Sequence, residues 1–204
     1  MNPSLEAVRR QFMDDITSCM DTVGMADNLA KSLPGLNLDE LYRYSLAGAV
    51  SALDTCVHSV VRVAAVLQLQ GIGPSHALEL PISSDLYRRH FQGDATAIGE
   101  IESAVRLAHG RWSMQFSADI SNAIKTVCSR PLWINIADGD PSKAKSLKDS
   151  LDAVVRRRNK IVHESDLDPS LGEKWPIDSD IALQSVRVIQ ERGTQIIQHV
   201  AQDY

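Results

Sequence analysis

Aromatic residues are scarce in this chain, at 5% of the total, and 11 glycines and 8 prolines are few for 204 residues. All-β folds need many turn residues and are enriched in aromatic side chains, so this composition favours helices. The N-terminal segment lacks the apolar core of a secretory signal, and no window approaches the roughly 18–20 apolar residues of a membrane-spanning helix. We therefore expect a cytoplasmic protein that makes no membrane contact.

Cysteine is also rare, and the chain lacks any CxxC pair. Cys19, Cys56 and Cys128 are odd in number and widely spaced, which is typical of a reducing compartment and of small buried side chains. P-loop, GxGxxG, HExxH and zinc patterns are absent as well. We therefore expect no cofactor and no metal ion.

Other potentially reactive or stacking side chains are scattered along the chain. Four histidines share no metal-ligand spacing and are expected at the surface or at helix caps: His76, His90, His109 and His199. Three tryptophans are expected to anchor the core or loops rather than to stack on bases: Trp112, Trp133 and Trp175. None of these residues enters the predicted site.

Hydrophobic periodicity and cap residues predict an all-α, single-domain helical bundle over residues 1–204, because no repeat, low-complexity tract or linker divides the chain. The expected helices span about 4–31, 37–70, 84–90, 94–108, 117–128, 141–165 and 179–202. The expected N-terminal caps are Ser4, Asn37 with Glu40 as a capping box, Asp94, Asp140 before Pro141, and Asp178 or Ser179.

The segment LDAVVRRRNKIVHESD, residues 151–166, ends the helix expected over 141–165 and carries polar residues that folding alone does not explain. Spacings of three and four place one set on a common helix face: Leu147, Leu151, Val154, Val155, Arg158 and Val162. An arginine on an inward face cannot lose its charge, so it needs a carboxylate, carbonyl, phosphate or water partner.

Asn159 and His163 lie four residues apart on the flank of that face. Arg158 and His163 are about 140° apart around an ideal helix. Only the length of the arginine side chain, an irregular turn or a second subunit could bring these two together.

The pattern R-N-x-x-x-H, formed here by Arg158, Asn159 and His163, resembles the signature of the HEPN superfamily, small helical proteins that include many RNases. VSALDTCVHSVVR, from Val50 to Arg62, resembles the core helix of the RiboL-PSP type of HEPN domain, and RRRNKIVHESD resembles its final motif. The resemblance implies a HEPN-type bundle with two long core helices that pairs as a homodimer, with both motifs facing one cleft. Ser165 stands where one HEPN toxin subgroup has a tyrosine.

Asp54 and His58 interrupt the apolar face of the helix expected over 37–70. One interpretation is a local hydrogen bond between them, with the remainder of the pair solvated. A second is that Asp54 pairs with Arg158 or orients His163, since an inward arginine needs a charge partner. A third, weaker one is a metal site formed by Asp54, His58 and His163.

Positive charge gathers around the motif, where residues 142–163 contain seven basic and two acidic residues in a chain of formal net charge −5. Such residues near a helix C-terminus are favoured by the helix dipole whatever the function. The local excess also suits a phosphate-bearing ligand. The residues expected to contact RNA are Arg156, Arg157, Lys160, Lys148 and Lys143.

The resemblance implies a metal-independent endoribonuclease, in which the ribose 2'-hydroxyl attacks the adjacent phosphate and leaves a cyclic phosphate. His163 would be the general acid or base, Arg158 would stabilise the transition-state charge, and Asn159 would orient the imidazole or bind phosphate. A bacterial toxin or phage-defence setting is implied, with an antitoxin or neighbouring defence protein as a further partner. The alternative is a non-catalytic module that binds RNA, nucleotides or a partner protein.

Overall fold

The computed structural model describes residues 1–74 and 82–204, and its secondary structure is helical, which confirms the expected all-α bundle. The helices are α1 (Pro3–Ser32), α2 (Asp39–Leu69), α3 (Ser84–Phe91), α4 (Ala97–His109), α5 (Ser117–Lys125), α6 (Leu132–Ile136), α7 (Pro141–His163) and α8 (Ser179–Ala201). Within the described ranges the only β pairing is an isolated bridge between Leu167 and Lys174. His76 lies outside the described residues.

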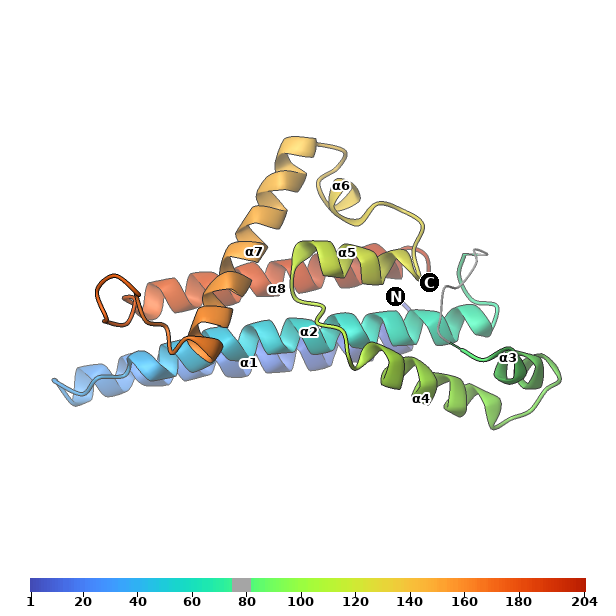
Figure 1. The fold of residues 1–204 in the computed structure, drawn as a ribbon, viewed down its shortest axis with the longest axis horizontal. Helices are drawn as coiled ribbons and strands as arrows, with labels where there is room; N and C mark the ends of the chain where they lie inside the picture. Colours follow the sequence, from blue (N-terminus) through green and yellow to red (C-terminus); the bar gives the residue numbers. More distant parts are fainter. Residues whose placement is uncertain (75–81) are drawn as a thin grey trace.

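α2 is the central helix of the bundle. α1 and α8 pack along it, and α4, α5 and α7 contact other parts of its surface. Figure 1 shows α1, α2 and α8 as a long layer from which α7 rises steeply, while α3 and α4 lie towards the opposite end from the α1–α2 turn. The main hydrophobic cluster takes residues from every helix of the described ranges. α2 is long and apolar enough to cross a membrane by composition, but 56% of its apolar window is buried inside the protein, as in a core helix.

Two of the expected N-terminal caps are wrong. α1 is capped by Asn2, whose side-chain oxygen accepts a hydrogen bond from the Ser4 N–H at 2.9 Å, because the helix begins at Pro3 and the cap lies two residues before Ser4. At the start of α2, Asn37 accepts from the Asp39 N–H at 2.9 Å. Glu40, however, bonds Lys174 and Arg43, so the capping box is not formed.

A third cap differs in detail, whereas two are confirmed. Asp94 accepts from the Thr96 N–H just before α4, but Thr96 holds the cap position. Asp140 accepts from the N–H groups of Ser142 and Lys143, and Asp178 accepts from the Ile181 N–H. Local signals therefore placed α7 and α8 correctly at their N-termini.

The region between α5 and α7 differs most from the sequence-based expectation. α5 ends at Lys125 rather than at Cys128, because Thr126 turns the chain and Cys128 becomes buried. The short helix α6 was not expected. Its Trp133 donates its indole N–H to the Ser117 carbonyl at 2.9 Å, so α6 is held by a contact to a residue far along the chain.

Gly193 marks the place where α8 crosses α1. A Cβ added to Gly193 would collide with the ring of Phe12, a fully buried side chain. We expect Gly193→Ala to lower the free energy of unfolding by about 1–3 kcal/mol through overpacking, as measured by urea denaturation. Gly24→Ala is the matched control, since no atom of the described residues lies within 4 Å of a Cβ there and alanine favours helix by about 1 kcal/mol. Equal effects at the two glycines would contradict the close approach.

Candidate functional site

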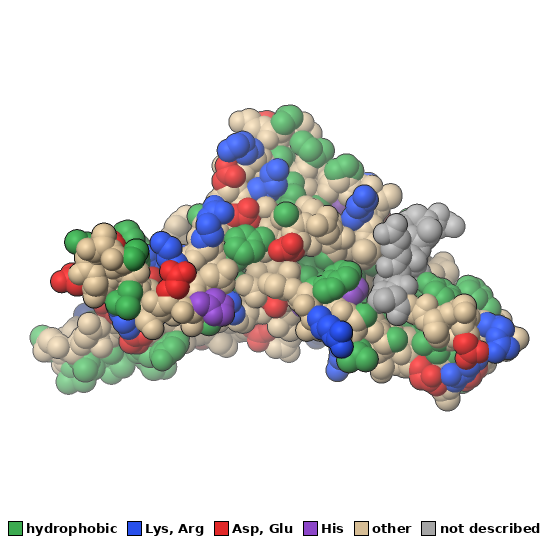
Figure 2. All heavy atoms as spheres, viewed as in Figure 1, with side chains coloured by type: hydrophobic (Ala, Val, Ile, Leu, Met, Phe, Trp, Pro, Cys, Tyr) green, Lys and Arg blue, Asp and Glu red, His purple; other side chains and the backbone are tan. Residues whose placement is uncertain are grey.

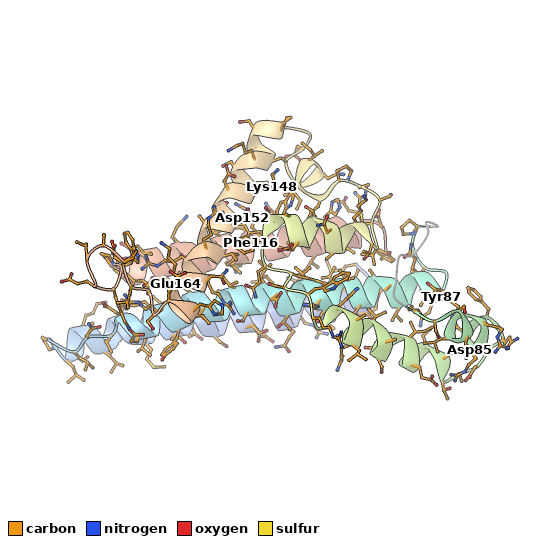
Figure 3. The ribbon with its side chains drawn as sticks, viewed as in Figure 1. Asp85, Tyr87, Phe116, Lys148, Asp152 and Glu164 are labelled. Atoms are coloured by element: carbon orange, nitrogen blue, oxygen red, sulfur yellow. The ribbon has the colours of Figure 1, made fainter. Side chains whose placement is uncertain are left out.

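The apolar face of α7 enters the core for only part of its length. Leu151, Val154 and Val155 are buried, as expected, whereas Arg158 is half-buried and Val162 is 49% exposed. On this face, which carries Arg158 and Val162, the last two turns of α7 therefore extend beyond the core. Figure 3 shows Glu164 at this end of the helix, where α7 reaches α2.

Arg158 makes one hydrogen bond in the described part of the chain, from Nη1 to the side-chain oxygen of Asn159 at 3.1 Å. Its Nε is buried without a hydrogen-bond partner, and no carboxylate among residues 1–74 and 82–204 pairs with it. His163 is exposed at the last position of α7. Since α7 is a continuous α-helix through His163, an irregular turn does not join it to Arg158. The remaining routes are the reach of the arginine side chain and a second subunit.

Asp54 and His58 have local partners. The Asp54 carboxylate accepts a hydrogen bond from the Met114 N–H at 2.7 Å and lies 3.8 Å from His58 Nε2. His58 Nε2 lies 3.1 Å from the Trp112 carbonyl oxygen, which can only accept, so Nε2 carries the proton. Within one chain Asp54 is thus engaged by the segment before α5, not by Arg158.

A metal ion finds no ready site in this region. Over the described residues no three His, Cys, Asp or Glu side chains are grouped so that they could hold one. The third interpretation, with Asp54, His58 and His163 as ligands, is therefore not supported by the arrangement of these side chains.

The Asp54 contacts predict additive effects with Arg158. We expect Asp54→Ala to cost about 1–2 kcal/mol, because the Met114 N–H loses its charged acceptor. The double variant with Arg158→Ala should then equal the sum of the single changes within about 0.5 kcal/mol in urea denaturation. Asp54→Asn keeps an acceptor oxygen and should cost less. A coupling above about 1 kcal/mol would instead place Arg158 beside Asp54.

Arg157, which was expected to contact RNA, instead pairs with Asp166. Its Nη2 donates to Asp166 Oδ2 at 2.7 Å and to the Pro176 carbonyl at 3.1 Å. Arg43 of α2 donates through Nε to the same Asp166 oxygen at 2.8 Å and through Nη2 to the Trp175 carbonyl at 2.8 Å. We call Asp166, Arg43 and Arg157 the loop clamp.

The loop clamp fixes the chain that leaves the motif. Asp166 is fully buried and Arg43 is 3% exposed, so both charges are removed from water and depend on each other. Ser165 and Asp166 both have positive φ, 53° and 58°, so the chain reverses sharply just after His163. Sequence analysis missed this cluster, although Arg43 lies on the apolar face of α2, the same signal that drew attention to Arg158.

The basic residues of α7 divide into paired and unpaired groups. Lys143 binds Asp138 at 2.7 Å, Lys145 binds Asp149 at 2.6 Å, and Lys160 lies 5.0 Å from the centre of the Trp175 ring. In the described part of the chain Lys148 and Arg156 have no ion pair. Figure 2 shows Lys and Arg side chains spaced along α7 with acidic groups between them. The surface of α7 is therefore less positive than the sequence of residues 142–163 indicates.

Asp152 connects α7 to α5. Its carboxylate accepts from the backbone N–H of Ser117 at 2.8 Å and from the Ser117 hydroxyl at 3.0 Å. α5 has no cap from its own preceding residue, so α7 supplies one. Figure 3 shows Asp152 beside Phe116 at the start of α5, with Lys148 about one turn earlier along α7.

A second polar cluster joins Cys128, His199 and Asp203. The Cys128 thiol donates to Asp203 Oδ2 at 2.9 Å and lies 3.4 Å from His199 Nε2. Burial, with help from Asp203, raises the pKa of Cys128 to about 11. The thiol is therefore protonated near neutrality, which does not suit a nucleophile.

The expected surface or cap positions are wrong for His199 and His109, which are 3% and 2% exposed. His90 does act as a cap, with Nε2 lying 2.9 Å from the Leu69 carbonyl oxygen at the end of α2. Both misplaced histidines lie near the C-terminal ends of their helices, where the sequence alone did not reveal the elements that cover them.

Comparison with known proteins finds no protein-family model, no curated protein and no solved structure that matches this chain. The resemblance to HEPN domains thus depends on the two segments quoted above and on nothing further. Function has to be argued from the site itself.

Proposed function

We propose that the protein is a metal-independent endoribonuclease whose reacting groups are Arg158, Asn159 and His163. The observation that carries this proposal is the state of Arg158. Its guanidinium is half-buried near the end of α7 that also carries the exposed His163 imidazole, and its only hydrogen bond within the described chain is to the neutral Asn159 amide. An uncompensated cation of this kind favours an anionic ligand from outside the chain.

The chemistry follows from these side chains. His163 would take the proton from the ribose 2'-hydroxyl as that oxygen attacks the adjacent phosphorus, and the bond to the 5'-oxygen would break. The departing 5'-oxygen would receive the proton that His163 has taken up, and the other product would end in a 2',3'-cyclic phosphate. Arg158 would stabilise the extra negative charge of the transition state.

Asn159 has its side-chain oxygen bonded to Arg158, so it orients the guanidinium rather than the imidazole in the single chain. Of the five residues expected to contact RNA, Lys148 and Arg156 have no ion pair with a described residue, so their charges are free to meet the RNA backbone. Lys143 and Lys160 are already engaged by Asp138 and Trp175, and Arg157 belongs to the loop clamp.

A homodimer would complete the site. The exposed Val162 and the half-buried Arg158 share the face of α7 that continues past the core, and a second α7 packed there would cover the apolar side chain. It would also bring His163 of one subunit towards Arg158 of the other. We propose a cytoplasmic setting with no membrane contact, and an antitoxin or defence partner as a regulator.

The second candidate is a module that binds RNA or a partner without cutting it. The paired state of several α7 cations favours the form of this module that binds a partner protein, because α7 then offers fewer free charges for a long RNA backbone. The two candidates differ in what happens to the RNA.

Product analysis on mixed RNA in EDTA tests the proposal. We expect cleavage to persist in EDTA and to leave cyclic phosphate ends, and light scattering at micromolar concentration to show a dimer. If a purified dimer binds RNA without cutting it, the binding module becomes the better explanation. If the chain stays monomeric and inactive, both the shared cleft and the endoribonuclease proposal are wrong.

A further inference from the structure

A pocket lies between α2 and α4, on a part of the molecule that the proposed cleavage site does not use. It measures about 270 Å³, several times the roughly 30 Å³ that one water molecule occupies in the liquid. It is lined by Thr55, His58, Ser59 and Arg62 from α2, and by Val105, Arg106, His109 and Gly110 from α4 and its end. Figure 2 shows basic side chains gathered where the end of α4 meets α2.

His109 is the side chain in this pocket that the fold leaves unexplained. It is 2% exposed and its ring stacks on Trp112 at 4.8 Å, yet both ring nitrogens are buried without a hydrogen-bond partner among residues 1–74 and 82–204. Burial, followed by the nearby His58, lowers the pKa of His109, so the imidazole is neutral near pH 7. A neutral imidazole presents one N–H donor and one acceptor nitrogen. In His109 neither nitrogen forms a hydrogen bond to a described residue.

The side chains around His109 are cationic or hydroxylic. Arg62 Nε is buried without a hydrogen bond to any described residue, although Glu102 Oε1 lies 3.4 Å away. Arg106 is exposed and has no ion pair with any described residue. Thr55 and Ser59, which precede Arg62 on the same face of α2, add their hydroxyl groups to the pocket lining. Two guanidinium groups thus face one carboxylate, so the pocket keeps a net positive charge.

We propose that this pocket binds a phosphate group, with Arg62 and Arg106 as its charged contacts and His109 as its buried polar contact. A phosphate matches the neutral imidazole, because a P–O⁻ oxygen accepts a hydrogen bond from the ring N–H. Guanidinium groups bind phosphate oxygens with paired hydrogen bonds. The phosphate can come from a mononucleotide or from an RNA chain, and the proposal concerns the group that they share.

A purely structural role does not account for the same observations. A histidine retained for packing alone would present its stacked ring to Trp112 without needing two unpaired nitrogens in a pocket lined by arginines. Phenylalanine at position 109 keeps a stacking ring and removes both nitrogens. His109→Phe is therefore expected to preserve or raise the melting temperature without ligand, while removing the response to phosphate.

The test is thermal denaturation of the full chain in sodium phosphate against sodium chloride at equal ionic strength. At ten times its Kd, phosphate should raise the Tm of the wild type by about 3–6 °C more than it raises that of Arg106→Gln or His109→Phe. Arg10→Gln, an exposed arginine on α1 with the same charge change, is the matched control and should respond like wild type. A general salting effect of phosphate acts on every variant alike and is removed by this comparison.

Two further arms separate the sources of the phosphate. Adenosine monophosphate binding, with no binding of adenosine, assigns the pocket to a terminal phosphate, whereas binding of an RNA oligomer without terminal phosphates, weakened by Arg106→Gln, assigns it to the chain. Equal phosphate responses in wild type, Arg106→Gln and His109→Phe would overturn the site.

The outcome is independent of the proposed cleavage. A protein that cuts no RNA can still show the phosphate response, and His163→Ala should keep it in full. Conversely, if the protein cuts RNA but shows no phosphate response, the phosphate site is wrong and the proposed cleavage site is unaffected.

Discussion

His163→Ala is expected to lower the rate of RNA cleavage by at least about 10²-fold, and by up to about 10⁴-fold, while the fold survives. General acid–base catalysis contributes this much, and the exposed imidazole makes no hydrogen bond to any residue that the structure describes, so its loss removes little packing. The measurement is single-turnover cleavage of the RNA that wild type cuts, with the melting temperature recorded beside it.

Glu164→Ala is the matched control for His163. It is the next residue, is also exposed, and lies at the end of the same helix, so it shares any effect of fraying. Cleavage by His163→Ala at the wild-type rate, or an equal loss in Glu164→Ala, would exclude the imidazole as the acid or base. Arg158→Ala should lose about 10²–10³-fold by analogy with a removed oxyanion donor, without the altered pH profile that loss of the imidazole produces.

The helical architecture could be predicted because its signals are local. Asp140 before Pro141 and Asp178 before Ser179 satisfy backbone N–H groups of the residues that follow, and the structure confirms both caps. α6 could not be predicted in the same way, because Trp133 is held by a carbonyl on α5. The start of α5 likewise depends on Asp152, 35 residues later in the chain.

The candidate site shows where reasoning from one helix ends. An arginine on an apolar face was expected to need a carboxylate, carbonyl, phosphate or water partner, and the carboxylate partner is found by Arg43, which is buried against Asp166, rather than by Arg158. Both arginines give the same pattern of spacing. The difference arises because the chain after α7 folds back over α2, and its turn at Ser165 and Asp166 requires two residues of positive φ that no glycine marks.

Asp166→Ala is expected to cost about 3–5 kcal/mol, the largest loss of stability from any single change considered for this protein. Asp166 is fully buried, and its removal leaves Arg43, which is 3% exposed, and Arg157 without their shared carboxylate. For a chain of this size the loss corresponds to a fall in Tm of about 6–20 °C. Asp166→Asn separates charge from backbone conformation, because asparagine also tolerates positive φ, and it should lose most of the same stability.

Ser165→Gly is the matched control for the backbone, since Ser165 has the same left-handed conformation and is exposed, and glycine should leave stability unchanged or raise it by up to about 1 kcal/mol. A rescue locates the cause. If the loss comes from uncompensated charge, Asp166→Ala should cost far less in a chain that also carries Arg43→Met and Arg157→Met, since a buried ion cluster can be replaced by apolar groups with little loss. An undiminished loss in that triple variant, or a mild effect of Asp166→Ala alone, would show that the loop after His163 is held by its backbone bonds rather than by the loop clamp.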